Sequence, residues 1–96
     1  MKMKNPFEAL GDPSRRQILK LLRAGSMTAG DIADQFALSK PTLSHHFRVL
    51  RAAGLVRTER RGTTIVYTLQ ANAIEELAAE LLDLTVLPKS KKVRSS

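Results

Sequence analysis

Two amphipathic segments joined by only about three residues constrain the fold of this chain more than any other feature. Apolar residues recur at helical spacing in residues 27–38, and Thr28 stands where a capping residue starts a helix. Ser39 follows at once, and its hydroxyl can cap a second helix that tolerates Pro41 in its first turn and ends before Gly54. Two helices with so short a connection predict a helix-turn-helix.

The segments on either side of this pair complete a single domain. Asn5 and Asp12 each precede a proline, which predicts a short helix and then a longer one before the pair. Residues 55–69 change toward a period of two around an Arg-Gly turn, which predicts a β-hairpin with a basic tip. Residues 70–87 are helical again. The order α-α-α-α-β-β-α predicts a mainly helical winged helix-turn-helix over residues 1–87.

Charge is distributed unevenly along the chain. Lys and Arg number 16 against 9 Asp and Glu, a formal net charge of +7 that favours an anionic partner. Residues 40–62 hold six cations and one anion, whereas residues 63–87 hold four acids and no base. This segregation predicts a basic working face and a last helix kept off it. Residues 88–96 add four cations and are expected to form a disordered basic tail.

The residue types argue against several classes of function. Without cysteine there is no disulfide, thiolate metal site or thiol switch, which fits an intracellular setting. No apolar run is long enough for a signal peptide or a membrane span, so we expect a cytoplasmic protein without a membrane partner. Neither a Ser, His and acid cluster nor a phosphate-cradling glycine loop is present. We therefore expect no enzyme and no cofactor.

Two adjacent histidines lie in the second helix of the pair. On a wheel of about 100° per residue, Leu43, Phe47 and Leu50 lie together and define the inward face. His45 lies about 200° from Leu43 and is expected to face outward, whereas His46 flanks the apolar stripe and is interpreted as a core-edge histidine. The two side chains diverge by about 100°, which argues against a shared metal ion.

Polar residues on this helix and on the hairpin are the predicted DNA contacts. The arginines among them would mainly neutralise phosphates, and Thr42, Ser44 and His45 would supply any base reading. The plainer alternative is that the hydroxyls only cap and fill the helix and that the basic tip is merely solvated. The predicted contacts are Ser39, Lys40, Thr42, Ser44, His45, Arg48, Arg57, Arg60, Arg61 and Thr63.

The last helix has an apolar face wider than one small domain needs, and it either closes the core of one chain or forms a dimer. We expect a homodimer through the first and last helices, because a two-fold pair of recognition helices would match a palindromic operator. The predicted interface residues are Phe7, Leu10, Ile74, Leu77, Leu81 and Leu84. A rival hypothesis is a protein-interaction module whose last helix docks a regulatory partner, with only residual DNA binding.

Four motifs, ALGDPSRRQILKLL, MTAGDIADQF, SKPTLSHHFRVLRAAGLV and RRGTTIVYTL, resemble those of the ArsR-type winged-helix repressors and, within them, the cysteine-free SdpR-like autorepressors. The resemblance covers roughly residues 5–87. It implies a homodimeric repressor that binds palindromic double-stranded DNA through the helix-turn-helix.

Many members of that family sense metals through cysteines in the first helix of the pair, or through Asp, His and Glu on the last helix. The corresponding segments here, TAGDIADQF and NAIEELAAELLDL, contain neither Cys nor His. This departure argues against a metal or thiol sensing site. It leaves a regulatory small molecule or protein partner open.

Overall fold

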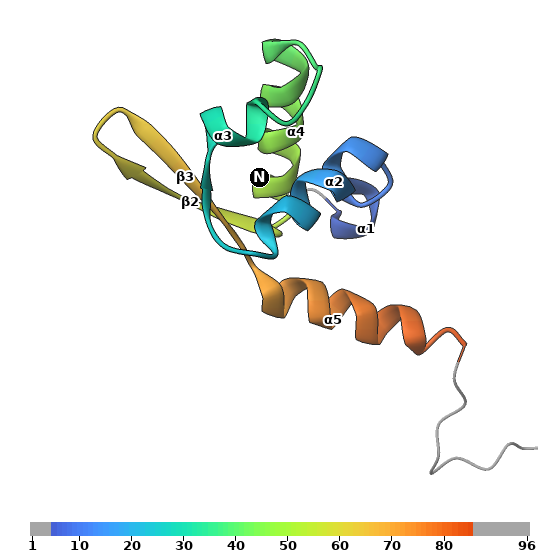
Figure 1. Cartoon of the computed structure of the whole chain (residues 1–96). Coiled ribbons are helices and arrows are strands. Elements are labelled where there is room, and N and C mark those ends of the chain that lie inside the picture. Colours follow the sequence, from blue (N-terminus) through green and yellow to red (C-terminus); the bar gives the residue numbers. More distant parts are fainter. Residues whose placement is uncertain (1–4, 86–96) are drawn as a thin grey trace, which may run out of the picture.

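The computed structural model describes residues 5–85, and the predicted basic tail lies outside them. The elements, shown in Figure 1, are α1 (Pro6–Ala9), α2 (Pro13–Leu22), β1 (Met27–Thr28), α3 (Ala29–Ala33), α4 (Lys40–Ala52), β2 (Val56–Arg61), β3 (Thr64–Leu69) and α5 (Ala71–Leu82). The order confirms the predicted winged helix-turn-helix, with one strand more than the sequence indicated. Two bounds differ from the prediction, because α3 ends at Ala33, six residues rather than about three before α4, and α5 ends at Leu82 rather than near residue 87. None of the helices within residues 5–85 is long and apolar enough to cross a membrane.

Side-chain caps begin the first four helices at the residues where the sequence predicts them. In each cap a side-chain oxygen accepts a hydrogen bond from a backbone N–H two or three residues further on, at 2.7 to 3.3 Å. The four capping residues are Asn5, Asp12, Thr28 and Ser39. Loss of such a cap typically costs about 1 kcal/mol, so these residues help to fix where each helix starts.

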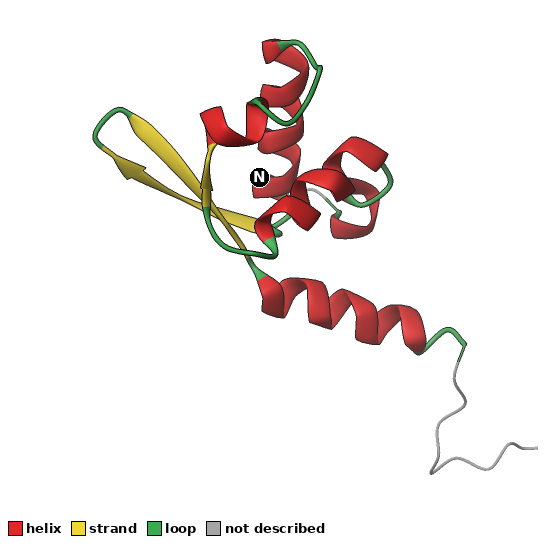
Figure 2. Ribbon diagram, in the orientation of Figure 1, coloured by secondary structure: helices red, strands yellow, loops and turns green. Residues whose placement is uncertain are grey.

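The extra strand, β1, ties the chain before α3 to the hairpin. The sheet order is β1-β3-β2, and Met27 and Thr28 lie opposite Tyr67 and Val66 in an antiparallel ladder. A strand of two residues is too short to show a period of two, which is why the sequence pattern missed it. Figure 2 shows this strand at the base of the long β2–β3 hairpin, which we call the wing.

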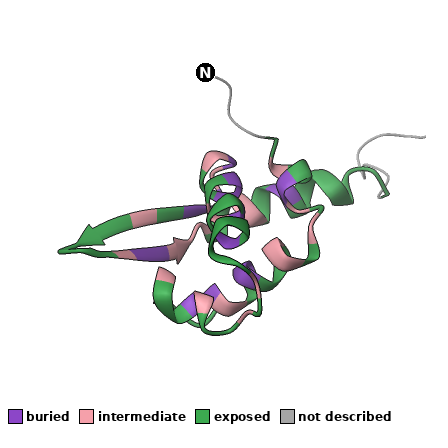
Figure 3. Ribbon diagram, turned by 90° about the horizontal axis from the view of Figure 1, so that it is seen from above, coloured by how far each residue is buried: buried purple, intermediate pink, exposed green. Residues whose placement is uncertain are grey.

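The core lies where α2, α3, α4 and the base of the wing meet. Its most completely buried large side chains are Ile18, Ile32, Leu50 and Leu55. Figure 3 shows buried residues gathered in this central region, while the outer half of the wing and most of α5 are exposed. The core therefore holds α4 and the base of the wing in a fixed relation.

Two glycines make the sharp changes of direction around the wing possible. Gly54, with φ of 78°, follows α4, and Gly62, with φ of 66°, lies in the turn at the wing tip. Side chains disfavour this left-handed region, whereas glycine enters it without steric cost. The turn keeps β2 and β3 in register from Val56 opposite Leu69 to Arg61 opposite Thr64.

Candidate nucleic-acid interface

The ten residues predicted to contact DNA are all exposed. They lie on α4, on its capping residue and on the wing. In Figure 1 the N-terminal end of α4 and the tip of the wing project from the body on the side away from α5. Two sets of polar residues that are separated in the sequence thus lie away from α5, which is on another side of the molecule.

The outward side of α4 presents free polar groups. Ser39 is occupied locally, because its Oγ accepts from Thr42 N at 3.3 Å and donates to Thr42 Oγ1 at 2.9 Å. The side chains of Ser44, His45 and Arg48 form no hydrogen bond within residues 5–85, and all three are exposed. These three groups remain available to base edges or phosphates.

The two adjacent histidines have the different environments that the helical wheel predicted. His45 is exposed, whereas His46 is 7% exposed. Their ring centroids lie 5.9 Å apart with an interplanar angle of 47°. Within residues 5–85 no group of three or more His, Asp or Glu is arranged to hold a metal ion.

His46 links α4 to the start of α2. Arg15 Nη1 donates to His46 Nδ1 at 3.3 Å, so the proton of the neutral ring lies on Nε2, which is 3.9 Å from Asp12 Oδ1. Burial lowers the pKa of His46 below 6.5, and nearby Arg15 lowers it further, although the Asp12 carboxylate acts in the opposite direction. The buried imidazole is therefore kept neutral, as a packed core residue should be.

The inward face of α4 differs in one respect from the face that the helical wheel predicts. Val49 is 7% exposed and belongs to the core, whereas Phe47 is only partly buried. Phe47 instead stacks on Tyr67 of β3, with centroids 4.5 Å apart and planes at 26°. A helical wheel takes no account of neighbouring elements. The sheet beside α4 gives Phe47 a stacking partner at the edge of the core.

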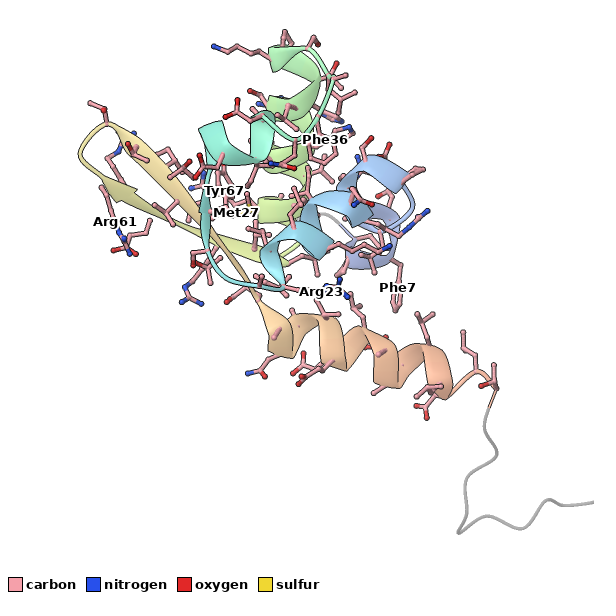
Figure 4. All side chains as sticks on the ribbon, in the orientation of Figure 1. Phe7, Arg23, Met27, Phe36, Arg61 and Tyr67 are labelled. Carbon is pink, nitrogen blue, oxygen red and sulfur yellow. The ribbon has the colours of Figure 1, made fainter. Side chains whose placement is uncertain are left out.

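The register of the wing separates its two tip arginines. Arg60 lies opposite Ile65, and alternation along β3 puts Ile65 and Tyr67 on one face, so Arg60 shares the face that is directed toward α4. Arg61 lies on the other face, where its Nη2 is 3.1 Å from Glu59 Oε1. Figure 4 shows Arg61 pointing away from the helices.

Arg51 and Tyr67 are not among the predicted DNA contacts, although both lie beside residues that are. With Ser44, Phe47 and Arg48 they line a hollow of about 210 Å³ between α4 and the wing. Burial raises the pKa of Tyr67 above 10.0, and Arg51 lowers it in part, so the hydroxyl stays protonated near neutral pH. The spacing of Ser44, Arg48 and Arg51 along one helix edge was the available signal; the tyrosine could come only from the fold.

The predicted dimer residues fall into three groups by exposure. Phe7, Leu81 and Leu84 are 38%, 47% and 79% exposed, and Leu10 and Ile74 are partly buried. Leu77 is only 7% exposed, so it already packs into the core of one chain and has little surface left for a second copy.

Comparison with known proteins agrees with this geometry. Residues 12–58 match the family described as bacterial regulatory proteins of the arsR family. The chain is 46% identical over 74 residues to the transcriptional repressor SdpR of Bacillus subtilis, covering 77% of this chain and 82% of that protein. The chain belongs to the ArsR family.

Other members resemble it over a similar extent. This ArsR-family chain is 38% identical over 75 residues to the arsenical resistance operon repressor of Staphylococcus xylosus, covering 78% of this chain and 72% of that one. The crystal structure of an ArsR family transcriptional regulator matches with a TM-score of 0.77 at 28% identity, covering 82% of this chain and 87% of that chain. The protein is thus a DNA-binding transcriptional regulator with a winged helix-turn-helix.

Proposed function

We propose that this ArsR-family protein is a repressor that binds an inverted-repeat operator as a homodimer. The observation that carries the proposal is the exposed polar and cationic surface formed by α4 and the wing, with α5 kept on another side. The names of the two relatives described above, both repressors, support the direction of regulation. The cytoplasmic location expected from the sequence belongs to this proposal, because the operator is there.

Apolar surface on α1 and α5 supports the homodimer. Phe7 and Leu81 are 38% and 47% exposed, and Leu82 is 59% exposed. An apolar hollow of about 250 Å³ also lies between α2 and α5, with Leu19 and Ile74 in its lining. Contiguous apolar surface of this kind usually marks an interface. To reach successive major grooves, such a dimer has to place its two α4 helices about 34 Å apart.

Binding would depend strongly on salt. The surface includes five cations among the ten predicted contacts, and the one acid in residues 40–62, Glu59, is paired with Arg61. Each phosphate neutralised releases counterions, so log affinity should fall with log salt with a slope of about −0.9 per phosphate contacted.

Selection from random double-stranded DNA tests the proposal, with the DNA upstream of the protein's own gene as a second probe for autorepression. We expect the recovered sites to form an inverted repeat and the affinity to fall linearly on a log–log salt plot. Recovered DNA without two-fold symmetry, or an affinity indifferent to salt, would contradict a dimeric repressor.

The exposed end of α5 favours a second candidate, the protein-interaction module. Leu82 and Leu84 are 59% and 79% exposed, and such a face could dock a regulatory protein instead of a second copy. Sedimentation at micromolar concentration separates the two candidates. A stable dimer supports the repressor, and a monomer supports the interaction module. Either form would act without a metal or thiol sensing site.

A further inference from the structure

We propose that the hollow between α4 and the base of the wing binds one backbone phosphodiester of the operator. Its volume is about 210 Å³, and its lining consists of Ser44, Phe47, Arg48, Arg51 and Tyr67. This inference rests on the proposed DNA binding and adds a defined phosphate contact that includes Arg51 and Tyr67.

Three of the lining residues come from one edge of α4. Ser44, Arg48 and Arg51 are spaced four and three residues apart, which keeps their side chains within about 60° on the helix surface. The other side of the hollow is built by the stacked pair Phe47 and Tyr67, with ring centroids 4.5 Å apart. The hollow therefore has polar groups along the α4 edge and a stacked aromatic pair on its other side.

The two guanidinium groups of the hollow are not neutralised within the chain. The one ion pair within residues 5–85 joins Glu59 to Arg61, and Asp12 lies beside the neutral His46 ring, so neither Arg48 nor Arg51 has an acidic partner there. Two unpaired guanidinium groups attract a phosphate, since their N–H groups match its oxygens and can bind two at once.

The Tyr67 hydroxyl supplies a neutral donor to the same site. Within residues 5–85 this hydroxyl forms no hydrogen bond, yet no buried side-chain oxygen or nitrogen there lacks a partner. The hydroxyl must therefore reach solvent, although the residue as a whole is 8% exposed. It can donate to a phosphate oxygen while its ring stays packed on Phe47.

The position of the hollow favours a phosphodiester of DNA over a free anion. In a winged helix-turn-helix the recognition helix enters a major groove and basic residues of the wing lie over the backbone or the adjacent minor groove. The DNA backbone that separates those two grooves must therefore cross the space between α4 and the wing. Arg60, on the wing face directed toward α4, continues the row of donors outward from the hollow.

The test uses the full-length protein, its selected operator and two substitutions at one position. Arg51→Gln removes a charge, and Arg51→Lys keeps the charge but removes the planar pair of donors. We expect Arg51→Gln to weaken binding about tenfold at low salt and to reduce the salt slope by about 0.9 for each hollow in the complex. Arg51→Lys should also weaken binding but retain the slope of the unmodified protein. Discrimination between the operator and base-pair variants of it should stay unchanged in both.

Operators with a single uncharged methylphosphonate locate the phosphate itself. The unmodified protein should lose affinity at several positions, one of which becomes insensitive in Arg51→Gln while the rest keep their effect. Tyr67→Phe, which preserves the stacked ring, should lower affinity three- to tenfold and weaken sensitivity at that same position. The other phosphates of the same duplex are the matched controls.

Distinct outcomes separate the possible failures. If the unmodified protein selects no DNA, the proposed function fails before the hollow is tested. If it binds its operator but Arg51→Gln keeps the same salt slope and the same sensitive phosphates, the assignment of the hollow is wrong. Saturable binding of inorganic phosphate to the free protein below millimolar concentration, abolished by Arg51→Gln, would assign the hollow to a free anion and overturn the DNA assignment.

Discussion

His46 connects three helices at the residue scale. Arg15, which donates to the His46 ring at 3.3 Å, also donates from Nε to the backbone oxygen of Ala9 at 2.7 Å. The end of α1, the first turn of α2 and the middle of α4 are thus joined through one guanidinium group and one imidazole. Asp12, which caps α2, lies on the other side of that ring.

Acid should weaken this connection and with it the fold. The pKa of His46 lies below 6.5 in the folded chain because of burial. As the pH falls through 6.5 toward that lowered pKa, the unfolded chain takes up a proton that the folded chain does not, so the free energy of unfolding decreases. We expect urea unfolding to show lower stability at pH 5.5 than at pH 7.5. His46→Gln should lose less over this interval, and His45→Ala should behave like the unmodified protein.

Single substitutions should separate the roles of the two histidines. His45→Ala should weaken operator binding several-fold with almost no change in thermal stability, because the side chain is exposed. His46→Ala should lower the free energy of unfolding by about 1 to 3 kcal/mol, since it empties a buried site and leaves Arg15 Nη1 without its acceptor. Thermal unfolding and operator titration on the same samples give both readouts. The opposite pattern would show that the assignment of the two rings is wrong.

At the scale of elements, α5 combines a structural residue with an exposed apolar end. Leu77 is buried in the chain, whereas Leu81 and Leu84 are exposed. The exposed leucines at the end of α5 and just beyond it are available to a second chain. Along the apolar face of α5, one part therefore packs into the core of the chain, and the part near its C-terminal end is left for a proposed partner.

Substitutions along α5 should show this division. The double variant Leu81→Gln and Leu84→Gln should shift the sedimenting species from dimer to monomer and leave the helical content unchanged. Leu77→Ala should instead lower the free energy of unfolding by about 2 to 5 kcal/mol, the usual range for emptying a core site. A dimer that persisted in the double variant would mean that another surface holds the two copies together.

Prediction of the elements from the sequence succeeded where the signal was local. Caps at Asp12 and Ser39 act within three residues, so they can be predicted from the sequence alone. The strand β1 exists only because β3 lies beside it, and Phe47 lies at the edge of the core, where it stacks on Tyr67 of β3. Both depend on pairing between distant segments.

At the scale of the whole molecule, the proposed dimer fixes the distance between two recognition helices. Inserting about five base pairs between the half-sites turns one of them by half a helical turn, to the opposite side of the duplex. We expect this insertion to reduce affinity to that of a single half-site, which titration of both duplexes would measure. Equal affinity for the original and the lengthened operator would mean that the two copies bind independently.

The sequence by itself determined where the first four helices begin, the helix-turn-helix, the basic segment and the different directions of His45 and His46. These features depend on capping, periodicity and charge within one segment. Only the tertiary structure decided that Leu77 belongs to the core, that Arg60 rather than Arg61 lies on the wing face directed toward α4, and that Tyr67 lies beside Arg51. Those outcomes depend on strand register and on packing between segments far apart in the chain, which no local pattern encodes.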